Sequence, residues 1–244
     1  MSLPRRVHAE LLDTLAADDP RAIRSRHDLR RINRLMATQS LIGTMLDKIM
    51  LDRIELDNIR CGSTAVRLLE LGAGDGQTLL RVARRYAACW PKVSLELLDV
   101  QPVISAQTLA SYRALGWDVD VIHADVFDWL AQPAAGTAPI ILANLFVHHF
   151  DGERLRALLN GIATRASAFL CCEPRRSRLA LTFSRLLGMI GCNEVTRHDA
   201  VASVHAGFSA QELSGLWPQA NVWSLREGRA GMFSHRFQAV AKRP

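Results

Sequence analysis

Three glycines at alternate positions follow a short apolar run in the segment 66–76, which reads VRLLELGAGDG. Because Gly72, Gly74 and Gly76 have no Cβ, the backbone there can adopt positive φ and can approach a bound molecule closely. A dinucleotide-binding turn has the spacing G-x-G-x-x-G and places a pyrophosphate at a helix N-terminus. Here residue 77 is glutamine, and the third glycine comes one residue early. The segment therefore predicts a ligand-binding turn without the dinucleotide fingerprint.

Acidic residues stand beside this turn and at the ends of the next apolar runs. Glu70 precedes the glycines, Asp75 lies among them, and Asp99 and Asp125 each end a later run. Such carboxylates would repel a phosphate, whereas they would attract hydroxyls, amines and a positive charge. Asp99 and Asp125 could instead cap the turns that follow them, and Glu70 could pair with a buried arginine.

Apolar runs alternate with amphipathic segments from about residue 65 onward. The predicted strands are 65–71, 93–99, 119–125, 139–145 and 168–173, and the predicted helices are 77–88, 104–116 and 151–166. This alternation is typical of a parallel sheet that is covered by helices on both faces. In such a sheet, ligands bind beyond the carboxyl ends of the strands, where the glycine turn and the acids would meet.

The two ends of the chain have other patterns. Residues 1 to about 60 predict only helices, over 5–16 and then 20–51, with Asp19 and Pro20 as a helix-start signal. The segments 221–228 and 232–242 predict a hairpin with Gly228 and Gly231 in its turn. We therefore expect an N-terminal helical cap over 1–60 and a ligand-binding domain over 61–244.

An apolar stripe in the second predicted N-terminal helix has two interpretations. Its residues are Leu41, Ile42, Met45, Leu46 and Ile49. They could form a flexible wall of the ligand site. Alternatively, the stripe could pack onto the main domain or form a homodimer interface.

Composition limits the class of protein. The chain has 244 residues, of which 49% are hydrophobic, so it can bury one substantial core. No apolar run is long enough to span a membrane, and the first residues include acids where a secretory signal would be apolar, so we expect a cytoplasmic protein. The five cysteines form no C-x-x-C pair, which predicts neither a disulfide framework nor a zinc ribbon. We assign no metal-binding residue.

The formal net charge of +6 raises the question of a nucleic-acid partner. Arginine is concentrated in 21–34 and in 173–178, and no aromatic residues that could stack on bases alternate with it. In the first cluster, apolar residues recur at helical intervals, which indicates a solvated face opposite a packed one. The charge pattern therefore does not favour nucleic acid.

Four motifs occur in order over residues 64–175: LLELGAGDGQTLL, LELLDVQP, HADVFDWL and ANLFVHHF. Together they resemble the motifs of class I S-adenosylmethionine-dependent methyltransferases. The resemblance implies a Rossmann-like α/β fold, with a mostly parallel seven-stranded sheet, an antiparallel C-terminal strand and the N-terminal helical cap. Segments 28–35 and 191–213 are also similar to small-molecule methyltransferases encoded near polyketide synthases. Because the second segment follows the fifth predicted strand, where an insertion can cover the active site, we expect a lid-like insertion near 189–210.

The resemblance also implies which residues hold S-adenosylmethionine and its product S-adenosylhomocysteine. They are Glu70, Gly72, Ala73, Gly74, Gly76, Asp99, Val100, Gln101, Asp125, Val126, Asn144 and Leu145. In this set, Asp99 would bind the ribose hydroxyls, Asp125 would accept the adenine amine, and Gln101 would reach adenine.

Histidines are the candidate catalytic residues. His148 and His149 follow the fourth predicted strand, where the resemblance places the methyl group, and an imidazole can remove a phenolic or enolic proton. Because adjacent residues at a helix start point in different directions, at most one is expected to face the site. The motif ANLFVHHF lacks the Asn-Pro-Pro-aromatic signature that recognises a base amine, so a nucleobase acceptor is not favoured.

The segment 191–213 supplies further candidates, His198 as a catalytic residue and His205 as a substrate-site residue. Alternatively, Arg197 and Asp199 could form a surface pair. Ser209 and Glu212 would then cap a helix in a capping box.

The sequence thus predicts an enzyme that transfers a methyl group to oxygen or carbon of a small aromatic, quinone-like or polyketide acceptor. Two alternatives stay open. One is an RNA- or protein-directed methyltransferase, and the other is a non-catalytic module that binds S-adenosylmethionine. The sequence does not name the acceptor, the atom methylated, a metal requirement or the oligomeric state.

Overall fold

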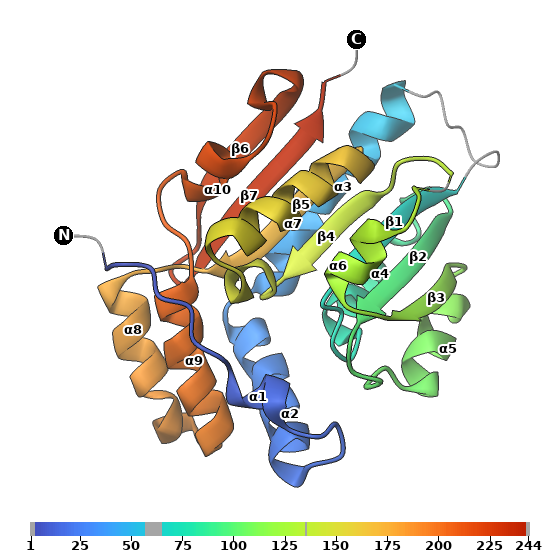
Figure 1. The fold of residues 1–244 in the computed structure, drawn as a ribbon. Coiled ribbons are helices and arrows are strands. Elements are labelled where there is room, and N and C mark those ends of the chain that lie inside the picture. The colour runs from blue at the N-terminus through green and yellow to red at the C-terminus, as the bar shows by residue number, and fades with distance from the viewer. Residues whose placement is uncertain (1–2, 57–64, 135, 243–244) are drawn as a thin grey trace.

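A seven-stranded sheet forms the centre of the computed structural model, which describes residues 3–56, 65–134 and 136–242 (Figure 1). Its strand order is β3-β2-β1-β4-β5-β7-β6. The strands are β1 (Val66–Leu71), β2 (Val93–Asp99), β3 (Asp118–His123), β4 (Ile140–Asn144), β5 (Ala168–Pro174), β6 (Trp223–Ala230) and β7 (Ser234–Ala241). β1 to β5 run parallel, and β7 is antiparallel to both of its neighbours, β5 and β6. The predicted Rossmann-like sheet is confirmed.

Helices cover both faces of the sheet because successive strand residues point to opposite sides. The helices are α1 (Leu11–Thr14), α2 (Pro20–Leu35), α3 (Thr38–Leu56), α4 (Gln77–Tyr86), α5 (Ala106–Ala114), α6 (Val126–Ala131), α7 (Gly152–Arg165), α8 (Arg178–Arg185), α9 (Glu194–Ala206) and α10 (Glu212–Leu216). Leu68 faces a core formed with α3, α4 and α5. Leu69 and Leu71 face a second core formed with α6, α7 and α10.

Short 3-10 helices complete the chain: η1 (Val147–His149), η2 (Leu187–Ile190) and η3 (Ala220–Val222). Among the described residues, no helix is both long enough and apolar enough to cross a membrane.

The N-terminal helices divide between two tasks. α1 and α2 lie with α8 and α9 beyond the end of β4, whereas α3 runs along the sheet (Figure 1). In α3, Ile42, Leu46 and Met50 are fully buried in the first core. The apolar stripe therefore packs onto the main domain, as the second interpretation required, and does not form a wall of the ligand site.

Two N-terminal expectations are corrected. The segment 5–16 is helical only over α1, and the predicted helix 20–51 is two helices, α2 and α3. Ala37 lies between them with φ 53°, outside the helical region, so the chain changes direction there. The start of α2 is as predicted, because the Asp19 side chain accepts from the backbone N–H of Arg21 at 2.7 Å and Pro20 occupies the first turn.

The C-terminal hairpin forms as predicted, with one difference. Gly231 lies in the turn between β6 and β7, with φ 69°. Gly228 lies within β6 instead of the turn, paired with Arg236.

The boundary between the proposed cap and the main domain, at residues 60 and 61, lies outside the described residues, as does Cys61. The division into these two domains stays a prediction.

Candidate active site

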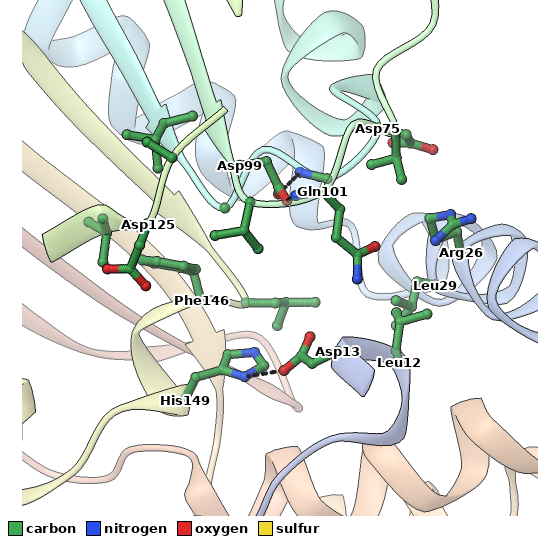
Figure 2. Close-up of a pocket in the computed structure, with 18 of the residues that line it drawn as sticks. Leu12, Asp13, Arg26, Leu29, Asp75, Asp99, Gln101, Asp125, Phe146 and His149 are labelled. Carbon is green, nitrogen blue, oxygen red and sulfur yellow. Dashed lines mark hydrogen bonds and ion pairs between the residues drawn. The ribbon is translucent and has the colours of Figure 1, made fainter. Parts of the chain in front are cut away.

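A cavity of about 410 Å³ lies beyond the carboxyl ends of β1, β2 and β4 (Figure 2). Its size lies within the range of about 300–1,000 Å³ that is typical of small-molecule sites. From the sheet side it is lined by Gly72, Gly74, Asp75, Leu98, Asp99, Val100, Gln101, Val103, Ala124, Asp125, Val126, Leu145, Phe146, His149 and Phe150. The N-terminal part of the chain contributes Leu12, Asp13, Arg26 and Leu29.

The glycine turn forms the floor of this cavity. Gly72, Gly74 and Gly76 all have positive φ, between 55° and 70°. A Cβ at Gly72 would lie 2.4 Å from a ring carbon of Phe146, whereas a Cβ at Gly74 would meet no atom of the described residues within 4 Å. Gly72 is therefore required for packing, and Gly74 leaves its backbone open to a ligand. Gly76 ends the turn and precedes α4.

Asp99 joins the glycine turn to the end of β2. Its carboxylate accepts from the backbone N–H of Gly74 at 2.7 Å and from that of Gln101 at 2.8 Å. Burial raises the pKa of Asp99, and these two hydrogen bonds oppose the rise. The carboxylate therefore holds the turn in place while it lines the cavity.

Asp125 caps α6 and also lines the cavity. Its side chain accepts from the backbone N–H of Phe127 at 2.7 Å. The capping alternative is thus correct for Asp125, and Asp99 likewise accepts from the turn that follows it. Neither role excludes ligand binding, because each carboxylate oxygen can accept more than one hydrogen bond.

Glu70, which is buried, and Asn144, which is partly buried, are polar residues near the ends of β1 and β4. Burial raises the pKa of Glu70 well above its usual range, and the charges of Asp75 and Asp99 add to the rise. The atoms Glu70 Oε2 and Asn144 Oδ1 are buried, and neither has a hydrogen-bond partner in the described part of the chain. Unpaired buried polar atoms are costly in a folded protein and call for an explanation.

Most of the predicted cofactor residues meet at the cavity. Those that line it are Gly72, Gly74, Asp99, Val100, Gln101, Asp125, Val126 and Leu145, and the others, Glu70, Ala73, Gly76 and Asn144, lie in the strand ends and turn behind it. Leu145 adopts φ 54°, which is unusual for a residue with a side chain. Its N–H donates to the backbone oxygen of Cys172.

The two adjacent histidines have different environments, as the sequence analysis expected. His149 lines the cavity, and its Nδ1 lies 3.2 Å from a carboxylate oxygen of Asp13 (Figure 2). His148 is buried and does not line the cavity. Of the pair, only His149 is placed to contact a ligand.

His148 is held between two carboxylates. Its Nδ1 lies 2.7 Å from Glu173, and its Nε2 lies 3.2 Å from both Glu10 and Ser203. Burial alone would lower the pKa of His148, but the hydrogen bonds to Glu10 and Glu173 raise it to about 9. At neutral pH His148 is therefore a buried imidazolium, and it anchors the segment that carries Glu10.

This segment, residues 3–14, is named the N-terminal strap. Besides Glu10, it is held by Arg5, which donates to the backbone oxygens of Ala206 and Phe150 at 2.7 Å. Asp199 of α9 accepts from the backbone N–H groups of Leu11 and Leu12 at 2.7 and 2.9 Å. The strap thereby places Leu12 and Asp13 at the cavity.

Glu10, His148 and His149 offer ligand atoms within 4.8 Å of one another, a spacing that could hold a metal ion. Histidine and carboxylate are ligands that zinc accepts. However, Glu10 and His148 are already hydrogen-bonded to each other and to Ser203. We therefore assign them to the strap contact and not to a metal site.

The candidates in the segment 191–213 do not reach the cavity lining. The side chain of His198 is 52% exposed, and its Nδ1 lies 2.9 Å from a carboxylate oxygen of Asp199. Neither His198 nor His205 is among the residues that line the cavity. The predicted surface pair of Arg197 and Asp199 is wrong, because Asp199 is buried and binds α1. Glu212 accepts from the backbone N–H of Ser209 at 3.1 Å, which is half of the predicted capping box.

Sequence reasoning missed the residues that complete the cavity wall. They are Leu12, Asp13, Arg26, Leu29, Leu98, Val103, Ala124, Phe146 and Phe150. Phe146 and Phe150 both belong to the motif ANLFVHHF, which contains the histidines, so the sequence offered a signal for them. The sequence offers no such signal for Arg26, because the spacing of apolar residues in its segment indicates a solvated basic face.

Solved structures share this fold. A plantazolicin methyltransferase, BpumL, crystallised with a triazolic desmethylPZN analog and S-adenosylhomocysteine, is 13% identical, with a TM-score of 0.63 over 92% of each chain. An O-methyltransferase family protein from Burkholderia thailandensis is 16% identical, with a TM-score of 0.51 over 84% of this chain and 60% of that one. Magnesium protoporphyrin IX methyltransferase from Synechocystis PCC 6803, crystallised with S-adenosylhomocysteine, is 14% identical, with a TM-score of 0.50 over 85% of this chain and 83% of that one.

Neither protein-family models nor curated proteins give a match to the chain. The likeness to solved structures defines the fold, which is the Rossmann-like fold of class I methyltransferases. At these identities, the activity must be argued from the site.

Proposed function

We propose that the protein is an S-adenosylmethionine-dependent methyltransferase that acts on oxygen or carbon of a small aromatic, quinone-like or polyketide acceptor. The observation that carries the proposal is the cavity itself. There, the glycine turn and two aspartates from successive strand ends line one space at the carboxyl edge of the sheet. The solved structures that share the fold were crystallised with S-adenosylhomocysteine in two of the three cases above.

The residues present fit an adenosyl ligand. Asp99 and Asp125 are separate hydrogen-bond acceptors in the cavity, suited to ribose hydroxyls and an adenine amine, and Val126 offers an apolar surface for a ring. The backbone at Gly74 is open to the cavity. The unpaired Glu70 Oε2 and Asn144 Oδ1 supply acceptors that a ligand amine could satisfy. When bound, S-adenosylmethionine would supply a methyl group activated by a sulfonium.

His149 is the residue proposed to remove a proton from the acceptor. It lines the cavity and faces Asp13, whose carboxylate can hold the imidazole in one orientation. Leu12, Leu29, Phe146 and Phe150 give the same cavity an apolar side, which suits an aromatic acceptor. His148 is buried and saturated with hydrogen bonds, so its proposed role is to position the strap.

The test of the proposal is cofactor binding measured by isothermal titration calorimetry with S-adenosylmethionine and S-adenosylhomocysteine. Replacing Asp99 by alanine should weaken binding by about 100-fold, because two charge-assisted hydrogen bonds to ribose would be lost. Asp118→Ala serves as the matched control, because Asp118 is an exposed acid at the start of the neighbouring strand. Since Asp99 also holds Gly74 and Gln101, the melting temperature of each variant must be measured alongside.

Failure of the unaltered chain to bind either ligand would remove the proposal, including the alternative of a non-catalytic binding module. An Asp99→Ala variant that is folded and binds with unchanged affinity would contradict the role given to Asp99. Methyl transfer to a panel of phenols and quinones, followed by mass spectrometry, would then separate an enzyme from a binding module.

A further inference from the structure

Arg26 of α2 is an unexplained charge in the cavity. Its Nη2 donates to the backbone oxygen of Ala17, which fixes the side chain from outside the cavity. Its Nη1 is buried and has no hydrogen-bond partner among the residues that the structure describes. Figure 2 shows Arg26 on the side of the cavity away from Asp125, with Asp99 and Gln101 between them.

The carboxylates of the cavity do not satisfy this guanidinium. Among the described residues that line the cavity, Arg26 is the one arginine or lysine, and the acids are Asp13, Asp75, Asp99 and Asp125. Each acid has another partner: His149 for Asp13, Arg30 at 2.5 Å for Asp75, and backbone N–H groups for Asp99 and Asp125. No ion pair within the described part of the chain involves Arg26.

A buried, unpaired guanidinium N–H group costs free energy unless a ligand accepts its hydrogen bond. A carboxylate matches the planar guanidinium better than any neutral acceptor, because two parallel hydrogen bonds can form. We propose that Arg26 is the residue that binds a ligand carboxylate in this cavity. The inference rests on the proposed function and adds a residue that none of the cofactor motifs contains.

Two ligands could bring the carboxylate. One is the amino-acid end of S-adenosylmethionine, and the other is an acidic acceptor. The positions of Asp99 and Asp125 favour the first, because a nucleoside bound by these two acids leaves its amino-acid end free to extend toward Arg26 (Figure 2). A carboxylate at Arg26 would also give the buried Nη1 group a hydrogen-bond acceptor.

The experiment compares two ligands in three proteins by isothermal titration calorimetry. The ligands are S-adenosylhomocysteine and its decarboxylated analogue, and the proteins are the unaltered chain, Arg26→Gln and Arg34→Gln. Arg34 is an exposed arginine near the end of the same helix, outside the cavity lining, so its replacement is the matched control. Arg26→Gln should bind S-adenosylhomocysteine about 10- to 100-fold more weakly, and it should bind the decarboxylated analogue as the unaltered chain does.

A third variant, Arg26→Lys, separates charge from shape. Lysine keeps the charge but cannot form two parallel hydrogen bonds, so its affinity for S-adenosylhomocysteine should lie between those of the unaltered chain and Arg26→Gln. Melting temperatures of all variants verify that each is folded.

If Arg26→Gln and Arg34→Gln bind S-adenosylhomocysteine with equal affinity, the next test asks whether Arg26 binds a carboxylate of the acceptor. Salicylate is then titrated into the proteins loaded with S-adenosylhomocysteine, and a loss of salicylate binding confined to Arg26→Gln assigns the carboxylate to the acceptor. Equal behaviour of Arg26→Gln and Arg34→Gln toward both ligands overturns the inference. By contrast, an unaltered chain that binds neither nucleoside ligand overturns the proposed function itself.

Discussion

His149 shows how a side chain from one motif depends on a residue far away in the sequence. It follows β4 at the cavity, and its Nδ1 faces Asp13 of the N-terminal strap. The imidazole is part exposed, with 23% of its side-chain surface accessible, so it can exchange a proton with a bound molecule. A base of this kind contributes to the rate of the reaction and little to cofactor affinity.

Replacing His149 by glutamine should therefore lower the turnover number by about 10²- to 10⁴-fold on the best acceptor from a panel of phenols and quinones. The affinity for S-adenosylhomocysteine should stay unchanged. His198→Gln is the matched control, because His198 also bonds an aspartate but lies outside the cavity lining. Undiminished turnover in His149→Gln would exclude the proposed role as a base.

At the scale of elements, the N-terminal strap completes the cavity and is held by charge. The buried imidazolium of His148 contacts Glu10 of the strap and Glu173 of β5. Burial alone would raise the pKa of Glu10, but the hydrogen bond from His148 and the charges of both histidines lower it, so the pair is charged at neutral pH. Strap and sheet are thus joined by a contact that needs a proton on His148.

The stability of the fold should consequently fall as the pH rises. The folded pKa of His148, about 9, lies above the ordinary value of 6.5, so its contribution is complete below pH 6.5 and is lost as the pH approaches 9. The expected loss of unfolding free energy over this window is on the order of 2 to 3 kcal/mol. Urea denaturation at the two ends of the window would measure it.

The control for this prediction is Glu10→Gln, which keeps the buried histidine but removes one of its two carboxylate partners. Its stability should change less across the same pH window than that of the unaltered chain. Equal changes in the two proteins would show that the contact between His148 and Glu10 does not set the pH dependence.

At the scale of the whole molecule, a cluster of arginines lies outside the cavity lining. Arg34, Arg81 and Arg85 line a groove of about 340 Å³ between α2, α3 and α4. Burial lowers the pKa of Arg81, and the charges of Arg34 and Arg30 lower it further, as expected where cations gather. The RNA-directed alternative needs a cluster of this kind to bind phosphates. Under that alternative, this groove is the place where RNA would bind.

Because the charge pattern does not favour nucleic acid, any RNA binding at this groove should be non-specific. The affinity for a short single-stranded RNA should fall steeply between about 50 and about 200 mM salt, and Arg81→Gln combined with Arg85→Gln should weaken it further. The same double variant should bind S-adenosylhomocysteine normally, because neither arginine lines the cavity. Tight RNA binding that persists at the higher salt concentration would favour the RNA-directed alternative over the small-molecule acceptor.

A homodimer through the N-terminal helices stays a separate prediction, and sedimentation by analytical ultracentrifugation would test it.

The sheet could be predicted because its determinants are local. Short apolar or β-branched runs recur at the positions of β1 to β5, and amphipathic segments were predicted after the runs that became β1, β2 and β4. This alternation predicted a parallel sheet covered by helices. The prediction was wrong at the strap, where 5–16 forms only one turn of helix. That segment is held by Asp199 and His148, which lie far along the chain, and such contacts leave no local pattern.

The sequence by itself determined the floor of the candidate site. Gly72, Gly74, Asp99 and Asp125 sit at strand ends, and the carboxyl ends of parallel strands meet at one edge of the sheet. Only the tertiary structure decided the opposite wall. Arg26 and Asp13 reach the cavity because α2 and the strap pack against α9, and that packing depends on side chains that meet only once the chain has folded. The structure also separated His148 from His149, since two adjacent residues on a short helical turn point in different directions.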